Sequence, residues 1–371
     1  MTNQATRTGP VGVGVIGAGV ISTQYLENLV QFADVKVLFI ADIDLERASA
    51  QAKAFGVPES GTVDELLAKP EIEIVINLTI PAAHVAVALQ ALAAGKNVWN
   101  EKPFALDRAS GRQLLDAARA AGLRVATAPD TILGPGLQAG RRLIENGAIG
   151  VPKTAITQFL APGPESWHPS PEFLFDIGGG PLFDIGPYYV TTLVQIFGTV
   201  SRVSALASKS RETRTIGSGP RAGTDFAVNV PTHVSALIEF ASGASAQSTF
   251  SFDSGITRVG IVEFTGTEGT IIFPDPNQFV GELSVYHPNV EPEIVSAAGS
   301  SYSRGTGVVE LARAIRAGRP ERASGEQAYH VTDVLIAIAE AAEYGHPIDV
   351  ASTVTIGDAL PEDWDPSAST L

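Results

Sequence analysis

The stretch Val11-Gly-Val-Gly-Val-Ile16 runs directly into Gly17-Ala-Gly-Val-Ile-Ser22, and these twelve residues decide the fold. The first six have the near-continuous apolar character of a strand buried on both faces. The next six read G-x-G-x-x-S and open a helical pattern. Gly17 permits a tight turn, Gly19 lets a diphosphate approach the backbone, and the third position needs only a small residue, which Ser22 supplies.

An acidic residue completes the pattern of a dinucleotide site. We expect the backbone amides at Val20 and Ile21 to bind a diphosphate, because they lie at a helix start. The second apolar strand ends at Asp42, 20 residues beyond the glycine-rich stretch (42 − 22), where a carboxylate can accept hydrogen bonds from the adenosine ribose. The Asp42 carboxylate would repel the 2′-phosphate of NADP, and the next residue, Ile43, offers no cation to bind it. The sequence therefore predicts NAD rather than NADP. Alternatively, Asp42 and Asp44 only cap the helix that follows them, a role that suits Asp44 better.

The pattern around this stretch predicts a parallel sheet. Short β-branched runs are separated by amphipathic helical segments. One of these helical segments places four apolar residues on a single face: Val85, Ala88, Leu89 and Leu92. Strands alternating with helices indicate a doubly wound Rossmann sheet, assigned to residues 1–130. Its strands are predicted at 11–16, 35–41, 72–78, 97–99 and 123–128.

The second part of the chain, residues 131–356, predicts an α+β domain with a large, mostly antiparallel open sheet. Residues 233–240 alternate polar and apolar side chains, as in a sheet with one covered face. Two amphipathic helices, around Val308–Ile315 and Val331–Ile338, should pack on sheets. The tail 357–371 is expected to be poorly ordered. The strands are predicted at 200–208, 233–240, 244–252, 257–264 and 270–273.

Composition narrows the class of protein. The 371 residues carry 25 basic and 40 acidic side chains, a net charge of −15, which disfavours binding to nucleic acid or anionic membranes. With no cysteine, disulfides and thiolate chemistry are excluded. No signal peptide or bilayer-spanning run is recognised, so a cytoplasmic location is expected.

Two segments carry candidate catalytic groups. Lys102 follows the strand at 97–99, at the sheet edge where ligands bind, although a single lysine is often only a surface residue. The bond preceding Pro103 is expected to be cis. Further on, a glycine-rich run leads to Asp184 and Tyr188, which would share one face of a helix beginning near Asp184 and could hold and deprotonate a hydroxyl. Alternatively, Asp184 caps that helix and Tyr188 fills the core.

A third candidate segment lies just before the glycine-rich run. Trp167 has an aromatic face suited to the C–H surface of a sugar ring, and His168 could hydrogen-bond a hydroxyl. Both residues could equally belong to an ordinary proline-bounded loop.

Together these motifs resemble the Gfo/Idh/MocA family, named for glucose–fructose oxidoreductase, inositol dehydrogenase and a rhizopine-catabolism protein. The resemblance covers nearly the whole chain. The similar segments are the glycine-rich turn, Ala82-Ala-His84 through Ala94-Gly-Lys96, Glu101-Lys-Pro103, Gly179-Gly-x-Leu-x-Asp-x-Gly186, Ala314-Ile-Arg-x-Gly-Arg-Pro320 and Ser324-Gly-Glu326.

The resemblance implies roles for the candidate residues. The counterpart of Lys102 lies against the nicotinamide ribose and the reacting oxygen, and that of Asp184 orients substrate and base. Many members carry His at the position of Tyr188, but members resembling glucose–fructose oxidoreductase and dihydrodiol dehydrogenase carry Tyr. Many carry Asp where this chain has Thr191, so no metal site is predicted.

By the same resemblance the cofactor contacts continue along the loops after two further strands. They are expected at Thr79, Pro81, His84 and Glu101, with His84 capping or packing rather than catalysing.

These expectations define an NAD(P)-dependent oxidoreductase acting on CH–OH groups. We expect an NAD-dependent dehydrogenase that oxidises a ring hydroxyl of a cyclic sugar, sugar derivative or polyol. The alternatives are an NAD-dependent glycoside hydrolase and a dinucleotide-binding sensor without activity. By the resemblance, another subunit covers the second face of the large sheet, giving a homodimer or homotetramer.

Overall fold

The computed structural model describes residues 8–371, which form two compact units. The first unit extends to Pro135 and includes Gly299–Tyr329 and Gly357–Leu371. The second comprises Gly136–Ala298 and His330–Ile356.

The first unit is built on a six-stranded sheet in the order β3-β2-β1-β4-β5-β6, with every pair of neighbours parallel. This order confirms the predicted Rossmann sheet. The edge strand β3 was not predicted, because its three residues are too short to show an apolar run. The strands are β1 (Val11–Ile16), β2 (Val35–Ala41), β3 (Glu59–Gly61), β4 (Ile74–Asn77), β5 (Asn97–Asn100) and β6 (Val125–Thr127).

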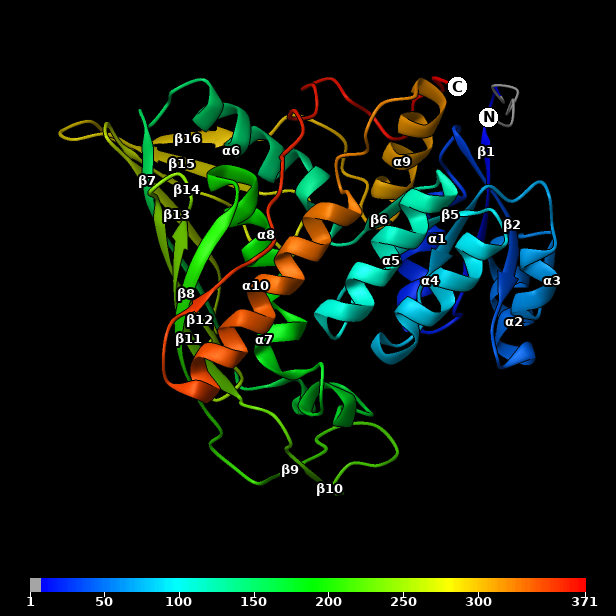
Figure 1. The fold of residues 1–371 in the computed structure, drawn as a ribbon, viewed down its shortest axis with the longest axis horizontal. Coiled ribbons are helices and arrows are strands. Elements are labelled where there is room, and N and C mark those ends of the chain that lie inside the picture. The colour runs from blue at the N-terminus through cyan, green and yellow to red at the C-terminus, as the bar shows by residue number, and fades with distance from the viewer. Residues whose placement is uncertain (1–7) are drawn as a thin grey trace. The chain divides into compact units, whose positions relative to one another are not determined.

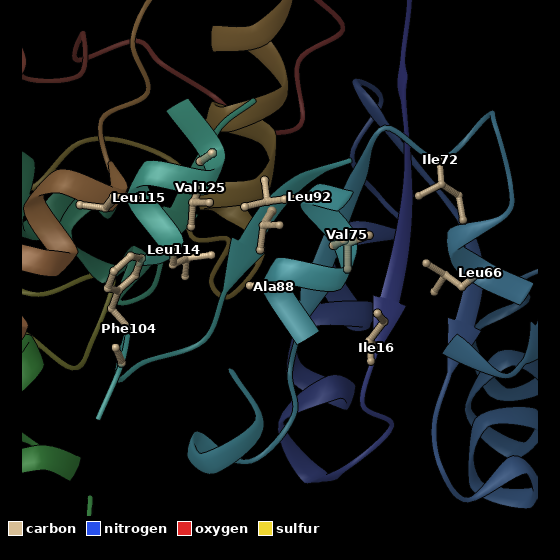
Figure 2. Close-up of a cluster of buried hydrophobic side chains, with 14 of the residues drawn as sticks. Ile16, Leu66, Ile72, Val75, Ala88, Leu92, Phe104, Leu114, Leu115 and Val125 are labelled. Carbon is tan, nitrogen blue, oxygen red and sulfur yellow. The ribbon is translucent and has the colours of Figure 1, made fainter. Parts of the chain in front are cut away.

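Helices cover this sheet, and a buried apolar cluster packs three of them against one face (Figure 2). In the cluster, Leu66 of α3, Leu92 of α4 and Leu114 of α5 meet apolar strand residues such as Val75. The helices of this unit are α1 (Val20–Leu29), α2 (Leu45–Phe55), α3 (Val63–Leu67), α4 (His84–Ala93), α5 (Arg108–Ala121) and α9 (Thr306–Ala317), with 3-10 turns η1 (Pro81–Ala83) and η2 (Asp130–Leu133).

The second unit contains a nine-stranded sheet in the order β16-β15-β14-β13-β7-β12-β11-β8-β17. Only the central pair β12–β7 is parallel, so the sheet is mostly antiparallel, as predicted. A small hairpin of β9 (Thr213–Thr215) and β10 (Asp225–Ala227) stands apart from it. The strands of the large sheet are β7 (Pro152–Leu160), β8 (Val200–Ser208), β11 (His233–Phe240), β12 (Ser245–Ser251), β13 (Arg258–Gly266), β14 (Thr270–Ile272), β15 (Glu282–Tyr286), β16 (Glu293–Ser296) and β17 (Ile348–Asp349).

The two faces of this sheet differ. On β11, Val234, Ala236 and Ile238 are buried, whereas Leu237 between them is 60% exposed. Helices α8 (Gly186–Phe197) and α10 (Gly325–Tyr344) lie on the covered face (Figure 1). The remaining helical elements of this part are α6 (Pro135–Glu145), α7 (Gly180–Asp184), η3 (Pro164–Ser166) and η4 (Glu172–Phe175). Among the described helices, none is both long and apolar enough to cross a membrane.

The C-terminal tail departs from its prediction as a poorly ordered segment. Asp34 accepts hydrogen bonds from the amides of Thr370 and Leu371, and from the Arg313 guanidinium. That guanidinium also donates to the carbonyl of Ala368 and lies over the Trp364 ring. The first unit ends at Pro135 rather than at residue 130, and it also includes Gly299–Tyr329 and the tail Gly357–Leu371.

Candidate functional site

The glycine-rich turn has the geometry of a diphosphate cradle. Gly17 has φ +103°, and a side chain there would meet the Leu78 carbonyl oxygen at 2.6 Å, so only glycine fits. Gly19 is the N-cap residue of α1, and a Cβ there would meet open space. The amides of Val20 and Ile21 begin the helix behind it. The turn therefore leaves room for an anion against a helix start.

Ser22 occupies the third position of the motif as expected of a small residue. It is fully buried, and its hydroxyl donates to the Gly19 carbonyl at 2.6 Å. Gln51 of α2 donates in turn to the Ser22 hydroxyl at 2.9 Å. A larger side chain would separate α1 from α2.

Asp42 and Asp44 make different contacts, and the predicted capping role of Asp44 is confirmed. Asp44 is the N-cap of α2, where its carboxylate accepts from the Arg47 amide. The Asp42 carboxylate accepts instead from the Ala18 amide at 2.6 Å, which ties the end of β2 to the glycine-rich turn. Burial opposes its charge, but hydrogen bonds from Arg47, Asp44 and Ala18 hold the pKa of Asp42 below its usual value. Asp42 is therefore an ionised acceptor at the end of β2, where the sequence predicts a ribose contact.

Exposed apolar side chains surround this edge of the sheet. Val20 follows β1 and is 87% exposed, Ile43 follows β2 and is 96% exposed, and Ile80 follows β4 and is 69% exposed. All three come after the carboxyl ends of neighbouring parallel strands, where dinucleotides bind in such folds. These residues fit an adenine-nucleotide cofactor lying across the edge.

Two asparagines that the sequence reading passed over join the loops after β4 and β5. Asn77 ends β4 and Asn100 ends β5, and both are fully buried. The Asn77 amide donates to Asn100 Oδ1 at 2.6 Å, and Asn77 Oδ1 accepts from the Thr79 hydroxyl at 2.7 Å. The sequence could have indicated these residues, because each of the two apolar strands ends in a polar asparagine.

His84 is buried at the start of α4, with Pro81 in the preceding turn η1. Its Nδ1 lies 2.8 Å from the Pro103 carbonyl oxygen, and its Nε2 lies 2.9 Å from the Thr79 carbonyl oxygen. Burial lowers the pKa of His84, whereas the two carbonyl oxygens favour the protonated ring, because a neutral imidazole can donate to only one of them. The imidazole therefore bridges the loops after β4 and β5, a packing arrangement of the expected kind.

The turn carrying Lys102 is anchored by Glu101. Glu101 Oε2 accepts from the Lys102 amide at 3.0 Å, and Oε1 accepts from the Tyr25 hydroxyl at 2.7 Å. Both carboxylate oxygens are thus bound to the protein, so Glu101 holds the turn rather than reaching outward. The Lys102–Pro103 peptide bond is cis, as expected.

Asp184 and Tyr188 lie at a helix junction in the second unit. Asp184 is the last residue of α7 and α8 begins at Gly186, so the helix that carries Tyr188 begins two residues after Asp184 and does not include it. The break has a physical cause, since Pro187 has no amide to donate to the Phe183 carbonyl, and its ring would clash with it. The N-cap of α8 is Ile185, so Asp184 does not cap that helix. Tyr188 is 6% exposed.

Trp167 and His168 lie in an irregular segment held by buried charges. The Trp167 ring, 67% exposed, packs edge-on against His168, which packs likewise against Phe173. Arg214 of β9 pairs with both Glu165, in η3, and Asp253. The loop is therefore fixed at its base by the ion pairs of Arg214, and it presents an aromatic surface. The sequence analysis did not predict this role of Arg214.

A Rossmann sheet, a glycine-rich cradle and an acidic residue closing β2 define an NAD-binding oxidoreductase. The chain belongs to the GFO/IDH/MocA family. Residues 11–128 match the family described as "Oxidoreductase family, NAD-binding Rossmann fold", and residues 137–272 match the "GFO/IDH/MocA C-terminal domain". The resemblance recognised in the sequence is thereby confirmed.

Similar proteins include several dehydrogenases and a reductase. The trans-1,2-dihydrobenzene-1,2-diol dehydrogenase of Sus scrofa is 27% identical over 313 residues, covering 82% of this chain and 86% of that protein. The 1,5-anhydro-D-fructose reductase of Ensifer adhaerens is 26% identical over 344 residues, covering 91% and 98%. A crystal structure of an NAD-binding oxidoreductase from Klebsiella pneumoniae has a TM-score of 0.80 at 24% identity, covering 93% of this chain and all of that one.

A levoglucosan dehydrogenase in complex with NADH and L-sorbose shares the fold, with a TM-score of 0.81 at 23% identity over 93% of this chain and 100% of that one. At this identity the likeness establishes the common architecture of both units.

Proposed function

We propose that this oxidoreductase is an NAD-dependent dehydrogenase of a cyclic sugar, sugar derivative or polyol, oxidising one ring hydroxyl. Bound NAD supplies the hydride acceptor. The observation that carries the proposal is the fixed Lys102 turn, which follows β5 at the cofactor edge and is held through its amide by Glu101 at 3.0 Å. The names of the similar dehydrogenases and the reductase support carbonyl–hydroxyl chemistry on small polar rings.

Three side chains divide the work in this proposal. The Lys102 ammonium polarises the substrate oxygen and stabilises the negative charge that develops on it. Tyr188 removes the hydroxyl proton as the general base. The Asp184 carboxylate orients the same hydroxyl by accepting a hydrogen bond. Trp167 and His168 contact the ring.

The experiment is a panel of cyclic sugars and polyols with NAD, followed by NADH absorbance. Stoichiometric NADH with one or a few compounds supports the dehydrogenase. Release of an aglycone from a glycoside without net NADH would instead identify an NAD-dependent glycoside hydrolase. Tight NAD binding with neither signal would identify a sensor, and either result would overturn the proposal.

The open face of the nine-stranded sheet suggests how the protein assembles. Leu237 lies in register with Gln247, which lies in register with Ile156, so two exposed apolar residues lie in one row on either side of a glutamine. Leu206 and Ile294 are also exposed. A symmetric dimer or a tetramer built from two dimers would cover these residues.

A further inference from the structure

The Arg214 side chain joins the small hairpin to two segments that leave the large sheet. Arg214 lies on β9, in the hairpin that stands apart from that sheet (Figure 1). Its guanidinium donates to the Pro162 carbonyl at 3.1 Å and to the Phe252 carbonyl at 2.9 Å. These two residues come just after the parallel strands β7 and β12. Because the Arg214 side chain is only 2% exposed, one buried group fixes the place where three segments meet.

The same guanidinium pairs with two carboxylates. Its Nη1 contacts Glu165 of η3, and its Nη2 contacts Asp253, which also accepts from the Thr232 hydroxyl at 2.6 Å. The two acidic side chains are mostly buried. Glu165 stands two residues before Trp167, so this ion pair acts directly on the segment whose aromatic face is proposed to contact the substrate ring.

The loop of the hairpin lies against the same segment. The Gly217 amide donates to the Glu165 carbonyl at 2.8 Å, and a Cβ at Gly217 would meet that oxygen at 3.1 Å. Gly219 has φ +74°, and a Cβ there would meet Pro169 at 2.7 Å. The absence of side chains at these two glycines lets the hairpin support the backbone on both sides of Trp167.

Stability alone does not account for a charged cluster at this place. Removing ions from water is costly, and apolar residues of similar volume often stabilise a protein as well as a buried ion pair does. Glu165 Oε2, Arg214 Nε and Ser218 Oγ are buried and have no hydrogen-bond partner among the described residues. Nearly all buried polar atoms in proteins are paired. The cluster therefore fits a role in fixing the geometry of the segment.

We propose that Arg214 is a positioning residue for substrate binding, which through Glu165 holds the Trp167 ring in the orientation that the substrate ring needs. Contacts with an aromatic ring depend on its orientation, so a segment free to move would bind the substrate more weakly. Arg214 acts through Trp167 and not on the reacting hydroxyl, so hydride transfer from bound substrate should be unaffected. This inference rests on the proposed function, which supplies the ring-shaped substrate.

The decisive variant is Arg214→Lys, which keeps the charge but lacks the planar fork that binds two carboxylates at once. Arg221→Lys is the matched control, because Arg221 lies in the loop of the same hairpin and forms a surface pair with Glu172. Pairs of this kind contribute little. Glu165→Gln tests the same contact if Arg214→Lys does not fold, and it should shift each measurement in the same direction.

The first measurement is steady-state kinetics with NAD and the panel compound that yields the most NADH. Arg214→Lys should raise KM by roughly threefold to tenfold, the worth of one aromatic or hydrogen-bond contact, and leave kcat within about threefold. In a Trp167→Ala background the same change should alter KM by less than about twofold, because the contact is already lost. An unchanged KM, a loss confined to kcat, or fully additive effects would overturn the inference.

The second measurement is time-resolved anisotropy of tryptophan fluorescence, which needs no substrate. Trp99 is completely buried and Trp364 lies under the Arg313 guanidinium, so a new fast motion would come from Trp167. We expect a nanosecond component in Arg214→Lys that is absent from wild type and from Arg221→Lys, and that disappears when Trp167→Ala is added. Identical decays in Arg214→Lys and wild type would overturn the inference. If wild type oxidises no panel compound, the proposed function fails, while the anisotropy still decides whether Arg214 fixes the segment.

Discussion

The Tyr25 hydroxyl donates a 2.7 Å hydrogen bond to Glu101 Oε1, and this contact links the first helix to the turn that carries Lys102. The same hydroxyl accepts from the Trp99 indole at 3.1 Å. Tyr25 and Trp99 are completely buried, and burial followed by the charges of Glu101 and Asp130 raises the pKa of Tyr25 well above its usual value. The phenol therefore stays protonated and serves as a permanent donor to the carboxylate.

Removing that hydroxyl should destabilise the first unit. In Tyr25→Phe the buried Glu101 loses a donor and the Trp99 indole loses its acceptor. Each loss costs about 1–3 kcal/mol, so we expect the free energy of unfolding to fall by roughly 2–6 kcal/mol. Urea denaturation measures this. Tyr286→Phe, at a half-exposed position on β15, should change little. A variant as stable as this control would show that water or a shifted side chain replaces the bond.

Lys102→Met should separate chemistry from cofactor binding. If the ammonium stabilises the developing oxyanion, kcat should drop at least about a hundredfold. The dissociation constant of NAD should stay within roughly threefold, because the cradle and Asp42 are untouched. Lys69→Met, which removes an exposed pair with Glu59, is the control. An unchanged kcat in Lys102→Met would make Lys102 a structural residue.

Local patterns predicted most of the first unit. Val11–Ile16 and Val35–Ala41 were predicted with their observed bounds, because both are apolar runs bounded by turn residues. The role of Asp44 as the cap of α2 also followed from position alone. In the second part, the strands 200–208 and 233–240 were likewise correct.

Features that depend on distant partners were not predictable in this way. The tail from Gly357 is held by Asp34, near the start of the chain, and by Arg313 of α9. The tail sequence itself carries no strong pattern that would predict these contacts. The central strand Pro152–Leu160 begins with a proline and mixes polar with apolar residues, so its place beside β12 was missed. The pairing of Asn77 with Asn100 depends on two strands becoming neighbours.

His330 should make stability depend on pH. Its Nε2 accepts from the Val200 amide at 3.0 Å, so the proton sits on Nδ1, 2.8 Å from the Ser352 hydroxyl. Burial lowers the pKa of His330 from 6.5 to about 4, although Asp333 and Ser352 oppose the shift. As pH falls, His330 is therefore protonated in the unfolded chain before it is protonated in the folded protein. Its contribution to the free energy of unfolding is fully present above pH 6.5 and is lost as pH falls through about 4. That difference corresponds to about 3 kcal/mol.

The measurement is urea denaturation at several pH values between about 7.5 and 4. Other groups titrate in the same range, so the comparison is with His330→Gln, which can keep both hydrogen bonds but cannot be protonated there. We expect the variant to lose less stability on acidification than wild type. Identical acid dependence in the two proteins would exclude His330 as the sensitive group.

Charge placed on the open sheet face should disrupt assembly. We expect wild-type protein to scatter light as a dimer or tetramer at micromolar concentration, because exposed apolar residues of this face such as Leu237 would otherwise face water. Leu237→Lys should lower the mass toward that of a monomer. Val30→Lys changes a residue of similar exposure at the end of α1 in the first unit and should leave the mass unchanged. A monomeric wild type would mean that the face needs no cover.

The most specific prediction concerns Tyr188. Tyr188→Phe removes only the hydroxyl and keeps the backbone carbonyl that accepts from Thr192, so folding and NAD affinity should be nearly unchanged. If Tyr188 is the general base, kcat should fall by roughly 10² to 10⁴. Tyr189→Phe is the matched control, since the adjacent Tyr189 hydroxyl accepts from the Gly260 amide and its loss should affect stability more than turnover. Asp184→Asn should also slow turnover, because the charge that holds the substrate hydroxyl is lost. Retention of nearly full turnover in Tyr188→Phe would make Tyr188 a packing residue, and His168→Asn would then be the variant to assay for the base.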